Sequence, residues 1–256
     1  MIRVPRADAN RSATRSRKPS TGAPGVSVIV PVLNEAGNLV RLLTALNAEV
    51  VSQEVIVVDG GSTDDGADVA AALGARVLPG PRGRGQQLSA GATDARGDIL
   101  LFLHADTRLP RGALTAMTRM LEGHPESPGG NFRILFDGDR RFDRWLEGFY
   151  AWIRSHGLYY GDSGIFVRRE AFRRLGGIRP IPVMEDYDLV RRLEAAGPTL
   201  CILEPPLVSS SRRFHGRHPV AIVLGWIRIH LLFHLGVAPA RLARLYDNER
   251  RRQDPA

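Results

Sequence analysis

Val55-Ile56-Val57-Val58-Asp59-Gly60-Gly61-Ser62-Thr63-Asp64 is a continuous apolar run that leads directly into a polar turn. A strand that is apolar at successive positions is typical of a parallel sheet whose two faces are both covered by helices. The two glycines permit a tight turn, and the oxygens of Ser62 to Asp64 can cap a following helix. This stretch therefore predicts a strand–turn–helix unit of an α/β fold.

Similar units precede and follow this stretch. An apolar strand at 26–30 is stopped by Pro31, and Asn34-Glu35 then opens a helix with leucines at helical spacing. Further along, two more apolar strands, at 75–78 and 99–103, have a helix between them. Because helices separate these strands, the first half is expected to be an open, parallel, Rossmann-like sheet.

The second half has a more mixed pattern. We expect helices at 140–155 and from near Arg169 and Glu185, and strands at 129–136, 164–168 and 199–208, the last broken by Pro205-Pro206. The predicted fold class is therefore α/β, with an open, mostly parallel sheet, flanking helices and additional helices at the C-terminus.

Polar residues stand at the ends of successive strands of the first half: Asn34-Glu35, Asp59, Arg82 to Arg84, and Asp106. The carboxyl ends of parallel strands form the edge where open α/β sheets bind ligands. Asp59 suits the hydrogen-bond donors of a base or a ribose, although an Asp before Gly also simply forms a turn. Arginines in a glycine-rich loop suit a diphosphate or a base, and Asp106 suits Mg²⁺ or Mn²⁺ bridging phosphates.

An acidic pair, Glu185-Asp186, follows about eighty residues after Asp106. A carboxylate that can hold a metal and one that can take a proton are what metal-assisted group transfer needs. Acidic residues in a first helical turn also stabilise the helix start, which is compatible with catalysis.

As an ordered set, these segments resemble the family 2 glycosyltransferases, which use a nucleotide-sugar donor on the A-type glycosyltransferase fold. Residues 28–35 and 57–64 look like the two nucleotide-binding strands and turns of the family. Leu103-His104-Ala105-Asp106 looks like its DxD segment, and Glu185-Asp186 like its catalytic pair. The resemblance covers about residues 26–215.

The resemblance implies a role for each matched residue. The residues expected to contact the donor are Pro31, Leu33, Asn34, Glu35, Asp59, Arg84, His104 and Asp106. Asp186, beside Glu185, would accept a proton from an acceptor hydroxyl or carboxyl group in an inverting, single-displacement transfer. A carboxylate is a modest base, so burial or Glu185 would have to raise the pKa of Asp186.

The chain looks closest to a bacterial subgroup in which His-Ala-Asp replaces DxD. His104 stands for the first Asp, so one negative charge is missing, and His104 could bond a ribose or phosphate instead of a metal. The cation, Mg²⁺ or Mn²⁺, would be held by Asp106 and by His215 or His218, which could equally be surface histidines of a basic loop. Close relatives in this subgroup are often labelled carotenoid-acid glycosyltransferases, which suggests a lipidic acceptor.

Other marks of this subgroup concern the acceptor side. They are Gly161-Asp162-Ser163-Gly164 and an arginine pair, Arg212-Arg213. Asp162 would contact the acceptor or the sugar. The arginines would hold a donor phosphate or an anionic acceptor.

The composition is that of a globular protein of 256 residues with one cysteine and a net charge of +8. One cysteine excludes an internal disulfide framework. The positive charge suits a nucleotide diphosphate, an anionic membrane surface or a nucleic acid. Residues 1–24 carry six basic residues and no apolar stretch of signal-peptide length, so we expect a disordered basic tail there.

The apolar segment 220–237 reaches transmembrane length, but a mid-span Arg228 makes spanning expensive. A helix packed on the core and an interfacial membrane helix both remain open. We expect a transferase domain at 25–216, with a donor half to about 108, an acceptor half from 109, and a helical extension at 217–256. The protein is expected to be cytoplasmic, with peripheral contact to the membrane through 220–237.

Three other functions compete with this reading. A nucleotidyltransferase would carry a glycine-rich phosphate loop after its first strand, where this chain has residues 31–35 instead. A basic nucleic-acid-binding protein would explain the charge but not the acidic residues at strand ends. A non-catalytic, sugar-nucleotide-binding relative would explain His104.

Overall fold

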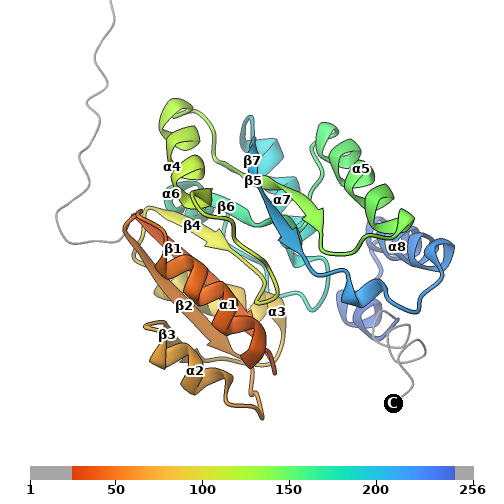
Figure 1. Ribbon diagram of the computed structural model, residues 1–256. Coiled ribbons are helices and arrows are strands. Elements are labelled where there is room, and N and C mark those ends of the chain that lie inside the picture. The colour runs from red at the N-terminus through yellow and green to blue at the C-terminus, as the bar shows by residue number, and fades with distance from the viewer. Residues whose placement is uncertain (1–24, 246–256) are drawn as a thin grey trace, which may run out of the picture.

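The computed structural model describes residues 25–245, except the side chain of Arg213, and consists of a seven-stranded sheet with helices on both faces (Figure 1). The strand order is β3-β2-β1-β4-β6-β5-β7. The strands are β1 (Val26–Val32), β2 (Gln53–Asp59), β3 (Arg76–Pro79), β4 (Ile99–Phe102), β5 (Gly129–Phe136), β6 (Ile165–Arg168) and β7 (Leu200–Ser209). The helices are α1 (Ala36–Asn47), α2 (Gly66–Ala72), α3 (Arg84–Asp94), α4 (Ala113–Gly123), α5 (Arg141–Ser155), α6 (Arg169–Arg174), α7 (Glu185–Ala196) and α8 (Pro219–His234), with short 3₁₀ turns η1 (Gly161–Ser163) and η2 (Arg212–Phe214).

The predicted parallel half is confirmed. Strands β3, β2, β1 and β4 are parallel neighbours, connected through α1, α2 and α3. Strand β6 then runs antiparallel to both β4 and β5, and β7 pairs with β5 in parallel. The sheet is therefore open and mostly parallel, with one reversed strand between its two halves.

Strand β1 shows why these strands are continuously apolar. Val28 and Val30 belong to the core on the face covered by α1 and α4, whereas Ile29 belongs to the core on the face covered by α3 and α7. All three side chains are fully buried. Because successive residues point to opposite faces, a strand covered on both faces is apolar at nearly every position, and the polar Ser27 of β1 is buried with its hydroxyl bonded to Glu54.

The carboxyl edge of the sheet is held partly by Asp64. Its carboxylate accepts one bond from the Gly66 N–H at 3.2 Å and another from the Ala36 N–H at 3.0 Å. Asp64 thus joins the starts of α1 and α2, but the N-cap position of α2 is Asp65, whose side chain forms no capping hydrogen bond, so the N-cap predicted at Ser62 to Asp64 is wrong. The Ser62 hydroxyl instead donates to Asp59, so it contributes to the turn and does not cap a helix.

The expected break of the last strand at Pro205-Pro206 is wrong. Strand β7 is continuous, but its register against β5 shifts: Phe132 lies opposite Ile202, and Ile134 lies opposite Leu207. The prolines thus fall in a bulge, where the absence of a proline N–H removes no bond of the ladder.

Helix α8 packs on α5 and α7 through one face, as expected for a core-packed helix. Ile222 and Ile229 are buried, and Trp226, Phe233 and Val237 pack against the same clusters. No helix among residues 25–245 is both long and apolar enough to span a bilayer. The predicted tail, 1–24, and the end of the helical extension, 246–256, lie outside the described residues.

Candidate functional site

The turns after β1 and β2 interlock at the carboxyl edge of the sheet. The Asp59 carboxylate accepts hydrogen bonds from the N–H groups of Gly61 and Ser62, at 3.2 Å each. Asn34 has φ of 56° and accepts a 2.8 Å bond from the Thr63 N–H. Asparagine tolerates this left-handed backbone better than most residues. Asp59 thus shapes its own turn, and its contact with a base stays a prediction.

Gln87 fixes the same edge from α3, although sequence reasoning did not single it out. Its Nε2 atom donates to the carbonyl oxygens of Val32 and Val58, at 2.8 Å each. The side chain is buried, so both bonds form away from water. The only sequence signal was a polar residue at the start of a helix after a glycine–arginine loop.

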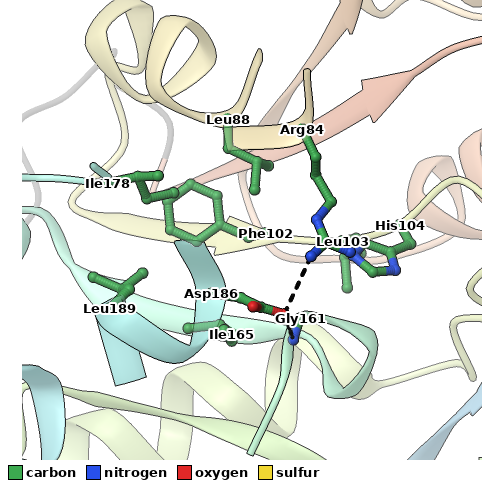
Figure 2. A pocket seen from close by; sticks show the side chains of 10 residues that line it. All are labelled: Arg84, Leu88, Phe102, Leu103, His104, Gly161, Ile165, Ile178, Asp186 and Leu189. Atoms are coloured by element: carbon green, nitrogen blue, oxygen red, sulfur yellow. Dashed lines mark hydrogen bonds and ion pairs between the residues drawn. The ribbon is translucent and has the colours of Figure 1, made fainter. Parts of the chain in front are cut away.

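The acidic pair begins α7 and faces α3. The Glu185 side chain is 1% exposed, and its Oε1 atom accepts a bond from Arg84 Nε. Arg84 Nη2 also lies 3.6 Å from Asp186 Oδ2 (Figure 2). Gly85 permits this contact, because a Cβ there would lie 2.9 Å from the Ile181 carbonyl oxygen. Arg84, predicted to contact the nucleotide, is thus an ion-pair partner of the predicted catalytic residues.

Asp186 is held in one orientation by backbone donors. Its Oδ2 atom accepts a 2.9 Å bond from the Gly161 N–H, and its Oδ1 atom accepts one of 2.8 Å from the Tyr187 N–H. Burial raises the pKa of Asp186, but Arg84, these two N–H groups and His104 together outweigh it, and the pKa lies below the ordinary value. The expectation that its environment raises this pKa is therefore wrong for this structure.

His104 lines the same small pocket as Asp186. Figure 2 shows Arg84, His104, Gly161 and Asp186 converging on a pocket whose other wall is apolar. Gly161 separates the two functional groups: a Cβ there would lie 3.1 Å from His104 Nε2 and 3.2 Å from Asp186 Oδ2. The structure therefore brings the end of β4 and the start of α7 together, as the sequence predicted.

A second charged cluster lies beside Asp106. Arg212 Nη2 donates to Glu35 Oε1 at 2.5 Å and lies 3.7 Å from Asp106 Oδ2. One guanidinium thus joins three segments, namely the end of β1, the end of β4 and the turn η2. Its predicted role, holding a donor phosphate or an anionic acceptor, stays a prediction.

The possible metal ligands around Asp106 suit a cation that binds together with the substrate. Residues 25–245 contain no cluster of three or more His, Cys, Asp or Glu that would enclose a metal ion. Mg²⁺ commonly binds through one or two carboxylates, substrate phosphates and water, so the single carboxylate of Asp106 suffices for that mode. His215 contacts the Ser211 hydroxyl at 3.2 Å and forms no such cluster with Asp106.

The remaining predicted residues are placed as follows. Asp162 is buried and accepts a 2.7 Å bond from the Tyr150 hydroxyl. Pro31 and Leu33 lie half-buried at the end of β1. The side chain of Arg213 lies outside the described part of the chain. Roles for these residues in binding the acceptor or the donor stay predictions.

Comparison with known proteins gives a consistent picture. The family model for glycosyl transferase family 2 matches residues 27–176. An uncharacterized glycosyltransferase of Mycobacterium tuberculosis is 38% identical over 98 residues, which are 38% of this chain and 44% of that protein. An undecaprenyl-phosphate 4-deoxy-4-formamido-L-arabinose transferase of Shewanella sediminis is 29% identical over 162 residues, 58% of this chain and 48% of that one. The matched part of this chain thus spans about half the length of these relatives.

Solved structures support the fold. A mannosyltransferase from Pyrobaculum calidifontis, in complex with GDP-mannose and Mn²⁺, superposes with a TM-score of 0.61 at 21% identity. The superposition covers 90% of this chain and 70% of the mannosyltransferase. At this identity the likeness establishes the shared architecture of the sheet and its flanking helices.

Proposed function

The chain belongs to glycosyl transferase family 2, and we propose that it moves a sugar from a nucleotide-diphosphate sugar to an acceptor hydroxyl or carboxyl group. The observation that carries the proposal is the convergence of Asp186 and the buried Glu185 with Arg84 and His104 at the carboxyl edge. Open α/β sheets bind their ligands at this edge.

We assign most of the donor site to the half of the chain before residue 109, with Arg212 of η2 added from the second half. The turns at 31–35 and 59–64 would receive the nucleoside, because they carry carboxylate and amide oxygens on rigid, interlocked backbone. Arg84 and Arg212 would receive the diphosphate, since guanidinium groups bind phosphate oxygens in a two-point geometry. His104 would donate to a ribose or phosphate oxygen.

Asp186 is the proposed base of a single displacement with inversion. Its lowered pKa keeps the carboxylate ionised near neutral pH, so it is ready to accept the proton of an acceptor hydroxyl. The oxygen of the acceptor would attack the anomeric carbon while the bond to the diphosphate breaks. If Arg84 turns toward the diphosphate, Asp186 loses its nearest positive charge and becomes a stronger base.

Asp106 is the proposed protein ligand of a Mg²⁺ or Mn²⁺ ion, with His215 as a second candidate. When bound, the cation would neutralise charge on the departing diphosphate. The mannosyltransferase mentioned above is a complex with Mn²⁺, which supports the choice of cation.

We further propose that the acceptor is lipidic, such as a carotenoid acid. The Shewanella relative carries undecaprenyl phosphate in its name, which supports a lipid-linked acceptor without identifying it. The apolar helix α8 beside the site also supports this class, because it would give an apolar molecule a surface to approach along.

A donor screen tests the proposal. The purified protein is incubated with Mn²⁺ or Mg²⁺ and UDP-, GDP- or dTDP-sugars, and the free nucleotide diphosphate is measured. We expect metal-dependent release from one donor, abolished by Asp186→Asn and by Asp106→Ala, with Asp98→Asn on the exposed surface as the matched control. Donor binding without turnover would identify a non-catalytic relative, and salt-dependent DNA binding without donor binding would favour the nucleic-acid function.

A further inference from the structure

Helix α8 has a second apolar face that points away from the protein. Val220, Leu224, Ile227 and Leu231 are each 57–59% exposed, and their spacing of four, three and four residues places them on one side of the helix. The face that packs on the core is a different one, centred on Ile229. A helix that is apolar all round is normally buried, so we expect another apolar surface to cover the outer face of α8.

An aromatic row on α5 continues this surface. Trp145 and Trp152 are 46% and 59% exposed, and Phe149 stacks between them with ring centroids at 5.2 and 6.1 Å. Trp226 of α8 stacks on the same Phe149 at 6.2 Å, so the two helices are in direct contact. Figure 1 shows them side by side at one end of the molecule.

We refer to the exposed residues as the α5–α8 surface: Trp145, Trp152, Val220, Leu224, Ile227 and Leu231. Its surroundings carry positive charge. The sequence from 205 to 246 contains six arginines and no Asp or Glu. Arg228 lies next to Ile227 on the helix and is exposed, and Arg241 and Arg244 follow in the next helical segment.

We propose that the α5–α8 surface binds the anionic surface of a lipid bilayer, with α8 lying in the plane of the interface. Apolar side chains that insert beside arginines are the pattern of interfacial helices, and tryptophans favour the boundary between apolar and aqueous layers. Charge complementarity selects this partner over a second copy of the chain, because self-association would bring two sets of arginines together.

The inner face of α8 connects this surface to the acidic pair. His230 Nε2 lies 2.8 Å from the Tyr160 hydroxyl, and His234 Nε2 lies 2.9 Å from the Tyr187 hydroxyl. Tyr160 precedes Gly161, whose N–H binds Asp186, and Tyr187 follows Asp186 directly. A bilayer-bound α8 would therefore hold the site close to the interface. This last step rests on the proposed function and suits a lipidic acceptor.

Vesicle flotation of the full chain tests the proposal without any nucleotide sugar. We expect binding to phosphatidylcholine–phosphatidylglycerol vesicles, weaker binding at high salt, and little binding to pure phosphatidylcholine. The triple variant Leu224→Ser, Ile227→Ser, Leu231→Ser should lose at least about tenfold in vesicle affinity, since each change removes apolar area from the bilayer contact. The matched control Val50→Ser, 85% exposed in the loop between α1 and β2, should bind like the wild type.

The same variants separate the alternatives. The basic termini are unchanged in the triple variant, so wild-type vesicle binding by that variant would overturn the proposal. A wild-type dimer in light scattering that becomes monomeric in the triple variant, with no flotation of either, would also overturn it in favour of self-association. Retained circular dichroism and retained nucleotide binding would show that the variant is folded. Because flotation needs no turnover, its outcome is independent of the donor screen.

Discussion

Arg84 contacts the acidic pair in this structure, and under the proposed function it would also bind the diphosphate of the donor. Glu185 depends on it, because its carboxylate is buried and its Oε2 atom has no hydrogen-bond partner among the described residues. Removing one partner of a buried ion pair leaves an uncompensated charge. The free-energy cost of that charge is larger than the stabilisation that the intact pair provides.

Arg84→Gln should therefore change the pH dependence of the reaction as well as its rate. Without the guanidinium the pKa of Asp186 rises, so the acidic limb of kcat/KM, where protonated Asp186 is inactive, moves to higher pH. We expect kcat/KM to fall by about 10- to 100-fold, as for the loss of a charge-assisted hydrogen bond. A pH–rate profile of both proteins measures this. An unshifted acidic limb would contradict the role given to Arg84.

Gly161→Ala should damage the site with little effect on the fold. The added Cβ would lie 3.1–3.2 Å from His104 Nε2 and Asp186 Oδ2, so these groups would have to move apart by a few tenths of an ångström. Misplacement of this size costs about tenfold or more in turnover when it affects reacting groups. Turnover and thermal unfolding are measured together, with Gly148→Ala on α5, whose Cβ meets nothing within 4 Å, as the control.

At the scale of elements, the strands of the parallel half and their order of appearance follow from the sequence. Their continuous apolar runs have one physical explanation, burial on both faces, and the polar turns after them then share one edge. The reversed strand β6 and the bulge in β7 do not follow, because they depend on pairing between segments far apart in the chain. Periodicity reports which face of an element is apolar, and it does not report which element covers that face.

The same limit applies to the site. His104, Asp106 and Asp186 were identified because each stands at the end of an apolar strand or at the start of a helix. The Arg84–Glu185 contact and the two bonds of Gln87 were not, since each joins residues separated by 29 to 101 positions. For 220–237 the sequence left a core-packed helix and an interfacial helix open, because both faces of α8 are apolar and only packing shows which residues are exposed.

Gln87→Leu tests whether α3 holds the carboxyl edge together. The change removes two buried hydrogen bonds and leaves the Val32 and Val58 carbonyl oxygens without this donor. We expect the free energy of unfolding to fall by about 1–3 kcal/mol, from two lost hydrogen bonds of about 0.5–1.5 kcal/mol each, because the Val32 carbonyl oxygen keeps its bond from the Gly60 N–H. Denaturant titration measures it, and Gln86→Leu, at an exposed position of the same helix, should change it by less than about 0.5 kcal/mol. Equal effects of the two variants would show that the bonds contribute nothing.

At the scale of the whole molecule, three carboxylates among residues 25–245 have a lowered pKa and hold different parts of the sheet. Besides Asp186, these are Glu54, which accepts bonds from the Ser27 hydroxyl and the Arg96 N–H, and Asp137, which accepts one from the Ser211 N–H. Burial raises the pKa of both Glu54 and Asp137. Their hydrogen bonds and the nearby Arg76 and Arg108 together lower it by more, so the pKa of each group lies below its ordinary value. The sheet is thus tied near both ends of its strand order by ionised groups.

The stability of the protein should therefore fall in acid. A carboxylate whose pKa is lower in the folded state binds its proton first in the unfolded state, so the stability that it contributes is complete above the unfolded pKa of about 4 and is lost as the pH falls through the folded value. Urea unfolding at pH 6, 5, 4 and 3 should give a free energy that decreases most steeply below pH 5.

The slope of this free energy against pH is proportional to the number of protons taken up on unfolding, and Glu54→Gln should reduce that number by up to about one. Ser27→Ala, which removes one of the bonds to Glu54, should have a smaller effect in the same direction. If the slope is the same in all three proteins, the charge of Glu54 does not contribute to the acid lability of the sheet.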